Sequence, residues 1–285
     1  MPLIGTVTGS YTAGRRASAF YRDWSPSNNL TPAFWIDASD TSSYSVSGSN
    51  VTAVTDKAGN ATITVNGTPN ITNLLDGKNT FNFQAGSNED LITNEFLQAS
   101  SGNHWAIGVF QWNNINDNQD SFWSVENNTV NATTAKRDYA VSSSDTSDFD
   151  GELDLDSLSV NRISTTIGNA QNFDSGIAKN TWKIIGVFFN KAGNQIGARV
   201  DGANAFTPVN DYDNSLTPNL DIRIFRNRSN ERMSGIVAEF FTVADVPGTG
   251  LINMDHFESA EGYLAHKWGL EGLLPADHPH KANAP

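Results

Sequence analysis

The chain has 285 residues, a formal net charge of −13 and no cysteine. Its length allows one large domain with a substantial core, and the missing cysteines exclude disulfides, zinc–thiolate sites and cysteine nucleophiles. The acidic charge repels phosphate backbones, so we expect no nucleic-acid partner. The longest apolar runs are too short for a bilayer and the first residues lack a signal-peptide pattern, so we expect no membrane insertion and folding in the cytoplasm.

Residues 1–30 differ in composition from the rest of the chain. They are rich in Gly, Thr and Ser, have no apolar periodicity, and carry a net charge of +2, which leaves −15 for the remainder. Such a segment cannot bury enough surface to fold alone. We predict an extended N-terminal arm that becomes ordered on a partner, with a frayed terminus as the alternative. The predicted anchoring residues are Tyr11, Arg15, Arg16, Phe20 and Trp24.

Residues 31–285 show short apolar runs separated by turn-forming clusters, which is typical of an all-β sandwich. We expect a single domain of about a dozen strands. The Asp76-Gly77 and Asp201-Gly202 pairs predict tight turns, and residues 190–194 predict a hairpin. The expected strands are Ala33–Ile36, Val51–Thr55, Ala61–Val65, Thr80–Phe83, His104–Trp112, Ser121–Glu126, Asp138–Ser142, Ser159–Ile167, Trp182–Asn190, Gln195–Asp201, Asp221–Phe225 and Ile236–Val243.

The sequence near the C-terminus predicts one amphipathic helix. Phe257, Ala260, Leu264 and Trp268 recur at three- and four-residue spacing and therefore share one helical face. Asp255 is a candidate cap at its start, and Gly269 followed by Pro275 predicts its end. A single amphipathic helix in a β protein must bury its apolar face against a sheet.

Several segments together resemble the laminin-G-like branch of the concanavalin A-like lectin/glucanase superfamily. The resemblance covers residues 31–285, is most specific in the closing segments 261–270 and 274–279, and implies a jelly-roll sandwich of two antiparallel sheets. Tails of this kind are common in phage and bacterial proteins of the family, whose members include lectins, adhesion modules and glycosidases. The other segments that carry the resemblance are 34–40, 54–60, 182–189, 197–202 and 233–241.

The stretch Glu152-Leu153-Asp154-Leu155-Asp156 resembles the catalytic strand of the family's glucanases. Retaining hydrolysis needs two carboxyl groups about 5–5.5 Å apart. Residues i and i+4 of a strand have backbones roughly 13 Å apart, a gap that two long glutamates can narrow. Here the last position is the shorter Asp156, so the proton donor departs from the family pattern. We therefore predict a protein that is not an enzyme, with a glucanase-type hydrolase as the less favoured alternative.

No metal or cofactor is predicted. The acidic segment from Asp145 to Asp156 could hold calcium, but aligning Gly151 with the EF-hand glycine leaves Thr146 and Ser157 where carboxylates are needed. We therefore predict a solvated acidic loop, with a calcium-binding loop as the alternative. We interpret Asp277 and His278 as surface turn residues. Arg223, Arg226, Arg228 and Arg232 are expected to balance nearby carboxylates.

The seven tryptophans are candidates for stacking on sugars. Trp105, Trp123, Trp182 and Trp268 lie in strongly apolar contexts and are expected in the core. Trp24 and Trp112 are expected to be exposed. Trp112 leads into the loop 113–118, so Trp112, Asn114 and Asn116 are the predicted glycan contacts; a loop that simply joins two strands is the alternative.

These features favour a non-enzymatic bacteriophage virion protein, either a head decoration or a tail fibre or adhesin. It would be assembled in the host cytoplasm as part of an oligomeric assembly, bound to other virion proteins through its arm, with weak host-glycan binding. A free or cell-associated carbohydrate-binding lectin is the alternative function.

Overall fold

A computed structural model describes most of the chain. The described residues are 24–71, 74–94, 96, 104–114, 121–126, 137–142, 152–154, 171–172, 177–190, 195–204, 209–210, 220–226, 232–244 and 253–285. The helices are α1 (Pro26–Asn29) and α2 (Met254–Trp268), with 3-10 turns at Ala85–Ser87 and Glu271–Leu273. The strands are β1 (Pro32–Asp37), β2 (Tyr44–Ser47), β3 (Asn50–Val54), β4 (Ile63–Asn66), β5 (Leu74–Leu75), β6 (Lys78–Asn79), β7 (Phe81–Phe83), β8 (Asp90–Thr93), β9 (His104–Asn114), β10 (Ser121–Glu126), β11 (Arg137–Ser142), β12 (Glu152–Asp154), β13 (Gln171–Asn172), β14 (Trp182–Asn190), β15 (Gln195–Val200), β16 (Ala203–Asn204), β17 (Val209–Asn210), β18 (Asp221–Ile224) and β19 (Ser234–Ala244).

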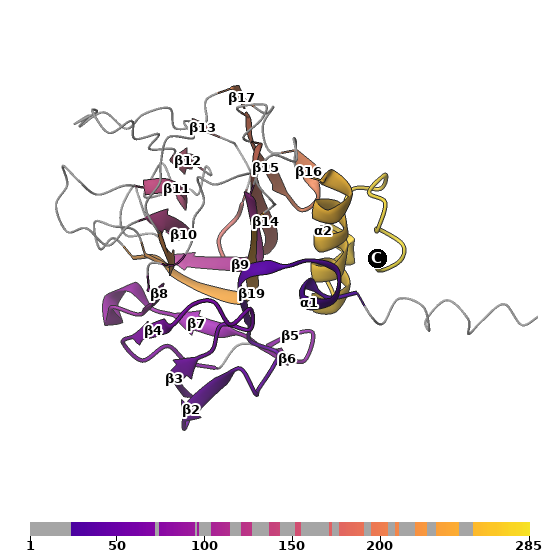
Figure 1. Cartoon of the computed structure of the whole chain (residues 1–285). Coiled ribbons are helices and arrows are strands. Elements are labelled where there is room, and N and C mark those ends of the chain that lie inside the picture. Colours follow the sequence, from indigo (N-terminus) through magenta and orange to yellow (C-terminus); the bar gives the residue numbers. More distant parts are fainter. Residues whose placement is uncertain are drawn as a thin grey trace, which may run out of the picture.

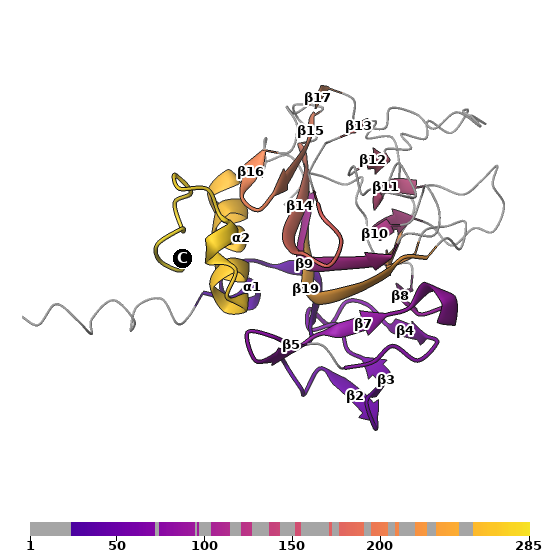
Figure 2. The same ribbon diagram turned by 180° about the vertical axis from the view of Figure 1, so that it is seen from behind.

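The strands form two large antiparallel sheets. The first has the order β1-β19-β9-β14-β15-β16, with β7 beside β19 and β17 beside β15. The second has the order β13-β12-β11-β10-β18-β8-β4. Figures 1 and 2 show the second sheet on one side of the first and α2 on the other. The predicted all-β, two-sheet antiparallel sandwich with a C-terminal helix is therefore confirmed.

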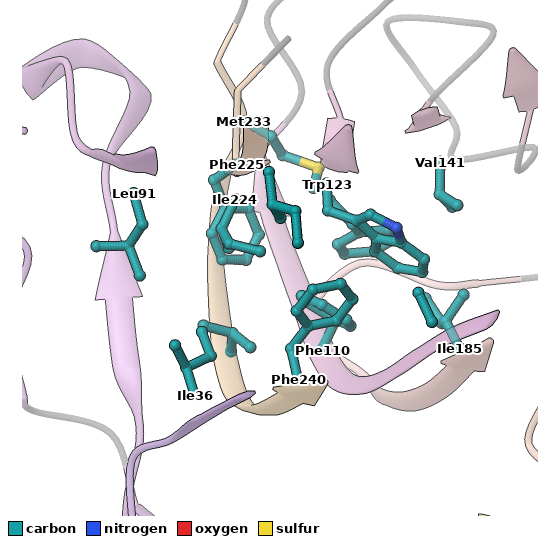
Figure 3. Close-up of a cluster of buried hydrophobic side chains, with 14 of the residues drawn as sticks. Ile36, Leu91, Phe110, Trp123, Val141, Ile185, Ile224, Phe225, Met233 and Phe240 are labelled. Atoms are coloured by element: carbon teal, nitrogen blue, oxygen red, sulfur yellow. The ribbon is translucent and has the colours of Figure 1, made fainter. Parts of the chain in front are cut away.

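The main core lies between the two sheets. The long side chains of β9, β10 and β19 meet there, and the Phe110 ring stacks on Trp123 with centroids 5.2 Å apart and planes 18° apart. Phe240 packs against both rings, as Figure 3 shows. Offset stacking and edge-to-face contacts of this kind stabilise an aromatic core beyond the area that it buries.

A second apolar layer lies between the first sheet and α2. Along β9, Trp105, Ile107 and Val109 face this layer, whereas Phe110 and Trp112 face the main core. The central strands of the first sheet are therefore buried on both faces, which explains why β9 is almost continuously apolar.

A β-bulge in β19 sets which residues reach α2. The register shifts between Val237 and Glu239, where β19 pairs with β9. Val237 and Phe240 both belong to the main core, so strict alternation between them is impossible, and the extra residue lets Ala238 and Glu239 both face α2. Without this bulge, Glu239 would point into the core.

Helix α2 has the face that the sequence predicts. Phe257, Ala260, Leu264 and Trp268 are all fully buried in the second layer. Gly269 ends the helix with a φ of 68°, a left-handed conformation that glycine adopts without a steric penalty. The cap at the start of the helix lies two residues before the predicted cap, Asp255.

The cap at the start of α2 is Asn253, whose side chain accepts a hydrogen bond from the backbone N–H of Asp255. Asp255 instead lies in the first turn, where its charge is favourable near the helix N-terminus.

Most of the expected strands are present within a few residues of their expected bounds, and Ser121–Glu126 and Trp182–Asn190 agree at both ends. The Asp76-Gly77 and Asp201-Gly202 turns have the positive φ angles that tight turns require. β14 and β15 pair as the expected hairpin. The expected strand Ser159–Ile167 lies outside the described residues. The short strands that were not predicted are β2, β5, β6, β8, β12, β13, β16 and β17.

The first described residues belong to the body rather than to an arm. The Trp24 ring lies 5.0 Å from the ring of Tyr263 on α2, and Leu30 packs against the same apolar layer. Between them Ser25 caps the short α1. Tyr11, Arg15, Arg16 and Phe20 lie outside the described residues, so the arm itself stays a prediction. Neither described α-helix has the length and apolar character needed to cross a bilayer.

Candidate functional site

Four of the segments that carry the family resemblance meet beneath α2, at the edge strand β1. They bring buried acidic, basic and aromatic side chains into one hydrogen-bonded group, although the segments are far apart in sequence. We call this group the β1–α2 network. Its members are Trp35, Asp37, Lys57, Glu239, Tyr263, Lys267 and Trp268.

Glu239 is the centre of the network and is fully buried. Its Oε1 accepts hydrogen bonds from Trp35 Nε1 at 2.9 Å and from the Tyr263 hydroxyl at 3.0 Å. Its Oε2 accepts one from Trp268 Nε1 at 2.9 Å and lies 2.7 Å from Lys267 Nζ. A buried carboxylate is tolerated only when it is paired and hydrogen-bonded, and these four donors meet that requirement.

Lys267 lies between two carboxylates that face each other across neighbouring strands. Asp37 on β1 is in register with Glu239 on β19, and like charges directly opposite each other destabilise a sheet. Lys267 Nζ lies 2.8 Å from Asp37 Oδ2, in addition to its contact with Glu239. The cation from α2 therefore reduces the repulsion between these two carboxylates and fixes the helix on the sheet.

Lys57, in the segment that follows β3, binds the same aspartate. Its Nζ lies 3.0 Å from Asp37 Oδ2 and 2.7 Å from Asp40 Oδ2, and 4.1 Å from the centre of the Trp35 ring. Asp37 Oδ1 accepts hydrogen bonds from Ser39, from the backbone N–H at 3.0 Å and from the hydroxyl at 2.6 Å. Both oxygens of Asp37 are therefore held by donors.

Burial and charge act differently on the acids of the network. Burial raises the pKa of Glu239, and Lys267 offsets this only in part. Burial also acts to raise the pKa of Asp37, but Lys267, Ser39 and Lys57 outweigh it, so the net pKa lies below its usual value. The hydrogen bond from Lys57 is the main cause that lowers the pKa of Asp40 to about 2. Glu239 is thus the carboxylate of the pair that binds a proton more readily.

Asp56 holds β1 in place next to the network. Its Oδ1 accepts hydrogen bonds from the backbone N–H groups of Trp35 and Ala58, and its Oδ2 from those of Asn60 and Ala61, at 2.8–3.0 Å. The side chain thereby satisfies one backbone donor of the edge strand β1 and fastens the segment 58–61 beside it.

A second buried ion pair fixes the middle of α2. Arg199 on β15 donates to both carboxylate oxygens of Glu261, at 2.8 and 3.0 Å. His278 Nε2 lies 3.1 Å from Glu261 Oε2, and its Nδ1 accepts the backbone N–H of His280. The interpretation of His278 as a surface residue is therefore wrong: the chain after α2 folds back onto the helix and buries it.

Gly262 allows this close return of the chain. A Cβ atom at this position would lie 2.3 Å from His280 Cβ, which is closer than any real contact. His266 Nε2 lies 2.8 Å from the His280 carbonyl oxygen, and Leu274 is buried in the second layer. The closing segments 261–270 and 274–279 therefore make these contacts within the protein.

The prediction that Trp112 is an exposed glycan contact is wrong. Its side chain is only 5% exposed, and its Nε1 donates a hydrogen bond to the Ile177 carbonyl oxygen at 3.1 Å. Asn114 is exposed at the end of β9, where its Oδ1 accepts a hydrogen bond from Lys179. Asn116 lies outside the described residues.

Because Trp112 is a core residue, we predict that Trp112→Phe acts on stability. The substitution keeps most of the apolar area but leaves the buried Ile177 carbonyl without its donor, which costs about 1–3 kcal/mol of unfolding free energy. Chemical denaturation of both proteins checks this. An unchanged unfolding free energy together with lost sugar binding would instead restore Trp112 as a contact residue.

The described surface offers no exposed tryptophan. Trp105, Trp123 and Trp268 are buried, which confirms their expected place in the core, whereas Trp182 and Trp24 are partly buried against the α2 layer. Trp35 and Trp112 are buried as well. In the described ranges, a sugar could therefore reach only the exposed parts of Trp24 and Trp182.

The buried carboxylates of the described residues are occupied by partners within the protein. Asp90 binds Arg232 at 2.6 Å and lies 3.8 Å from Arg226, and Asp221 binds Arg223 at 3.1 Å, which confirms that this basic group balances carboxylates. Arg228 lies outside the described residues. Glu89 accepts the backbone N–H of Gln84.

The segment that resembles a glucanase strand is only partly described. Glu152–Asp154 form β12, in which Leu153 pairs with the core residue Val141. Asp156 and the acidic residues 145–150 lie outside the described residues, so catalysis and calcium binding by this segment stay untested. Elsewhere in the described ranges, no cluster of three His, Asp or Glu side chains could hold a metal ion.

Comparison with known proteins supports the fold. No family model matches the chain, and no curated protein matches it. Domain 4 of an extracellular arabinanase from Geobacillus stearothermophilus, solved with arabinotriose, has 10% identity and a TM-score of 0.50 over 70% of this chain and 88% of that one. Cell entry of botulinum neurotoxin type C depends on interaction with two ganglioside molecules, and a structure of this toxin has 8% identity and a TM-score of 0.54 over 82% of this chain.

A sialidase from Trypanosoma rangeli, solved with 2,3-difluorosialic acid, has 10% identity and a TM-score of 0.51 over 82% of this chain. This chain spans 51% of the toxin chain and 32% of the sialidase chain. At these identities the likeness shows the fold alone, an antiparallel β-sandwich.

Proposed function

We propose that the protein is a non-enzymatic component of a bacteriophage virion that displays a glycan-recognising β-sandwich and is fastened by its N-terminal arm. The observation that carries the proposal is the lectin-like sandwich, which is shared with a domain solved with arabinotriose and with a toxin that interacts with gangliosides. Fold likeness supports recognition of sugars without specifying the sugar.

The occupied carboxylates support a role other than hydrolysis. Glycosidases need a pair of carboxyl groups that face the substrate bond. Asp37 and Glu239 are a described pair of carboxylates on neighbouring strands. Their oxygens are taken up by Lys57, Lys267 and the indole and hydroxyl donors, so they do not face a substrate.

Glycan contact is best placed at the end of β9. Asn114 is exposed there and leads into the asparagine-rich loop with Asn116, whose amides can bind sugar hydroxyls. Since Trp112 is buried, binding would depend on hydrogen bonds and would be weak. Lys179, which donates to Asn114, would belong to the same contact surface.

Attachment is assigned to residues 1–23. This segment carries a net charge of +2 beside a body of −15, so electrostatic attraction to acidic neighbouring subunits supports the arm as an anchor. Tyr11 and Phe20 would supply aromatic contacts, and Arg15 and Arg16 charged ones.

Deletion of residues 1–23 tests this function. A cut before Trp24 keeps the ring contact with Tyr263 and the Ser25 cap, so we expect a folded protein with unchanged thermal stability that no longer joins particles. Electron microscopy and mass spectrometry of purified particles check the incorporation. Normal incorporation of the truncated protein would overturn the anchoring role.

A glycan array with the same truncated protein tests sugar binding separately from the anchoring role. Weak binding that Asn114→Ala reduces supports it, and binding to no glycan overturns it. Strong, specific binding by a protein that never enters particles would favour the free lectin instead.

A further inference from the structure

Lys267 contacts two carboxylates at once in a water-poor setting. Its Nζ lies 2.8 Å from Asp37 Oδ2 and 2.7 Å from Glu239 Oε2, and Glu239 is fully buried. We propose that Lys267 and Asp37 form an intramolecular isopeptide bond, with Glu239 transferring the protons. This inference does not depend on the proposed function.

The geometry selects Lys267 over Lys57 as the nucleophile. Lys57 also reaches Asp37 Oδ2, at 3.0 Å, but its second partner is the partly exposed Asp40 rather than Glu239. Only Lys267 touches both the electrophilic carboxylate and a buried carboxylate that can take its proton. Lys57 remains a cation on Oδ2, where negative charge grows during the attack.

The bond forms by loss of one water, and no other reactant is needed. The Lys267 ammonium gives a proton to Glu239, and the lone pair of the resulting amine forms the Nζ–Cγ bond with Asp37. The Cγ–Oδ2 bond then breaks, and its electron pair leaves with the oxygen. Two of the three ammonium protons pass in turn through Glu239 to this oxygen, which departs as water. Glu239 ends as a carboxylate, and the third proton stays on the amide.

The surroundings are suited to each part of this step. Oδ1 of Asp37 stays behind as the amide carbonyl, already held by the Ser39 N–H and hydroxyl. The indole N–H groups of Trp35 and Trp268 hold Glu239 in position. Burial raises the pKa of Glu239, which favours its role as proton acceptor.

Two physical effects favour the condensed product. A neutral amide avoids the desolvation cost of a buried ion pair, and the fold holds the reacting groups together at an effective concentration of about 10⁵–10⁸ M. The link would join the first strand of the body to its last helix, 230 residues apart. It would thereby lock α2 to the strand nearest the arm.

Mass spectrometry of the denatured, full-length protein tests the link. We expect the wild type to be lighter than its sequence mass by one water, and Lys267→Arg and Glu239→Gln to have their full sequence masses. Lys179→Arg is the matched control, since this exposed lysine contacts Asn114 and should leave the mass deficit unchanged. A wild type at its full sequence mass overturns the proposal without any variant.

A tryptic digest separates the isopeptide from other dehydrations. Asp76-Gly77 and Asp201-Gly202 can also lose water by cyclising, but they give linear peptides. The isopeptide gives a branched peptide that contains both Asp37 and Lys267, with no cleavage after Lys267. A water deficit that persists in Lys267→Arg, or the absence of the branched peptide, counts against the link.

Discussion

A chain that ends at residue 252 is expected not to give a soluble, folded protein. Helix α2 and the segment after it cover the outer face of the first sheet, where Trp105, Ile107 and Phe241 are buried. Removing the cover exposes this apolar face to water. Such a surface favours aggregation.

The expected loss is comparable with the whole stability of a domain. Phe257, Leu264, Trp268 and Leu274 are buried in this layer, and each such side chain contributes about 1.5–3 kcal/mol. Their sum, about 6–12 kcal/mol, is similar to a typical unfolding free energy of about 5–15 kcal/mol. The charge contacts of Lys267 and Glu261 are lost as well.

The soluble fraction and the circular dichroism of the truncated protein check this prediction. The protein that lacks residues 1–23 is the matched control, because it retains every described residue of both apolar layers. A soluble chain of residues 1–252 with cooperative unfolding would show that α2 is dispensable for the fold.

The apolar pattern was enough to predict the helix and most of the strands. Four buried positions of α2 follow from spacing alone, and the long strands β9, β14 and β19 follow from their apolar runs. Short strands such as β2 and β8 carry too few apolar residues to stand out from the surrounding turns. The bulge in β19 leaves no mark in the sequence, because it depends on pairing with β9.

The β1–α2 network was missed because its members lie in four separate parts of the chain. The available signals were Glu239, a charge inside the apolar run from Ile236 to Phe241, and Lys267, a charge next to the buried face of α2. Taken alone, each charge only interrupts an apolar pattern and does not indicate a partner. Their pairing depends on the register of β1 with β19 and on the position of α2, which spacing does not give.

Trp112 and His278 were misplaced for a related reason. Trp112 stands at the end of a strand before a polar loop, which predicts exposure, but the segment near Ile177 covers it. His278 stands between prolines in a polar tail, and the tail folds back over Gly262. In both cases a second segment, distant in sequence, supplies the cover.

Arg199→Met is expected to lower the unfolding free energy by about 3–5 kcal/mol. Glu261 is only 1% exposed, and Arg199 supplies two of its hydrogen bonds, so the substitution leaves a buried carboxylate with His278 as its remaining close partner. We also expect the segment after α2, which His278 fastens, to become sensitive to protease. Denaturant unfolding and limited proteolysis measure the two effects.

A double variant distinguishes the contribution of the Arg199–Glu261 pair to the unfolding free energy from the penalty of leaving Glu261 buried without Arg199. Arg199→Met combined with Glu261→Met removes both charges and replaces them with apolar side chains of similar length, a change that is often neutral in buried pairs. We therefore expect the double variant to regain much of the stability that the single variant loses. Lys78→Met is the control, because its pair with the exposed Asp76 is worth about 0–1 kcal/mol.

The result bears on what the closing motif contributes to the fold. If the double variant is as stable as the wild type but its last residues are cleaved readily, the ion pair sets the path of the tail rather than the stability of the body. A double variant no more stable than Arg199→Met would instead show that Glu261 stabilises the fold through His278 and the backbone. In either case Arg199, Glu261 and His278 act on one another within the molecule, because all three are buried.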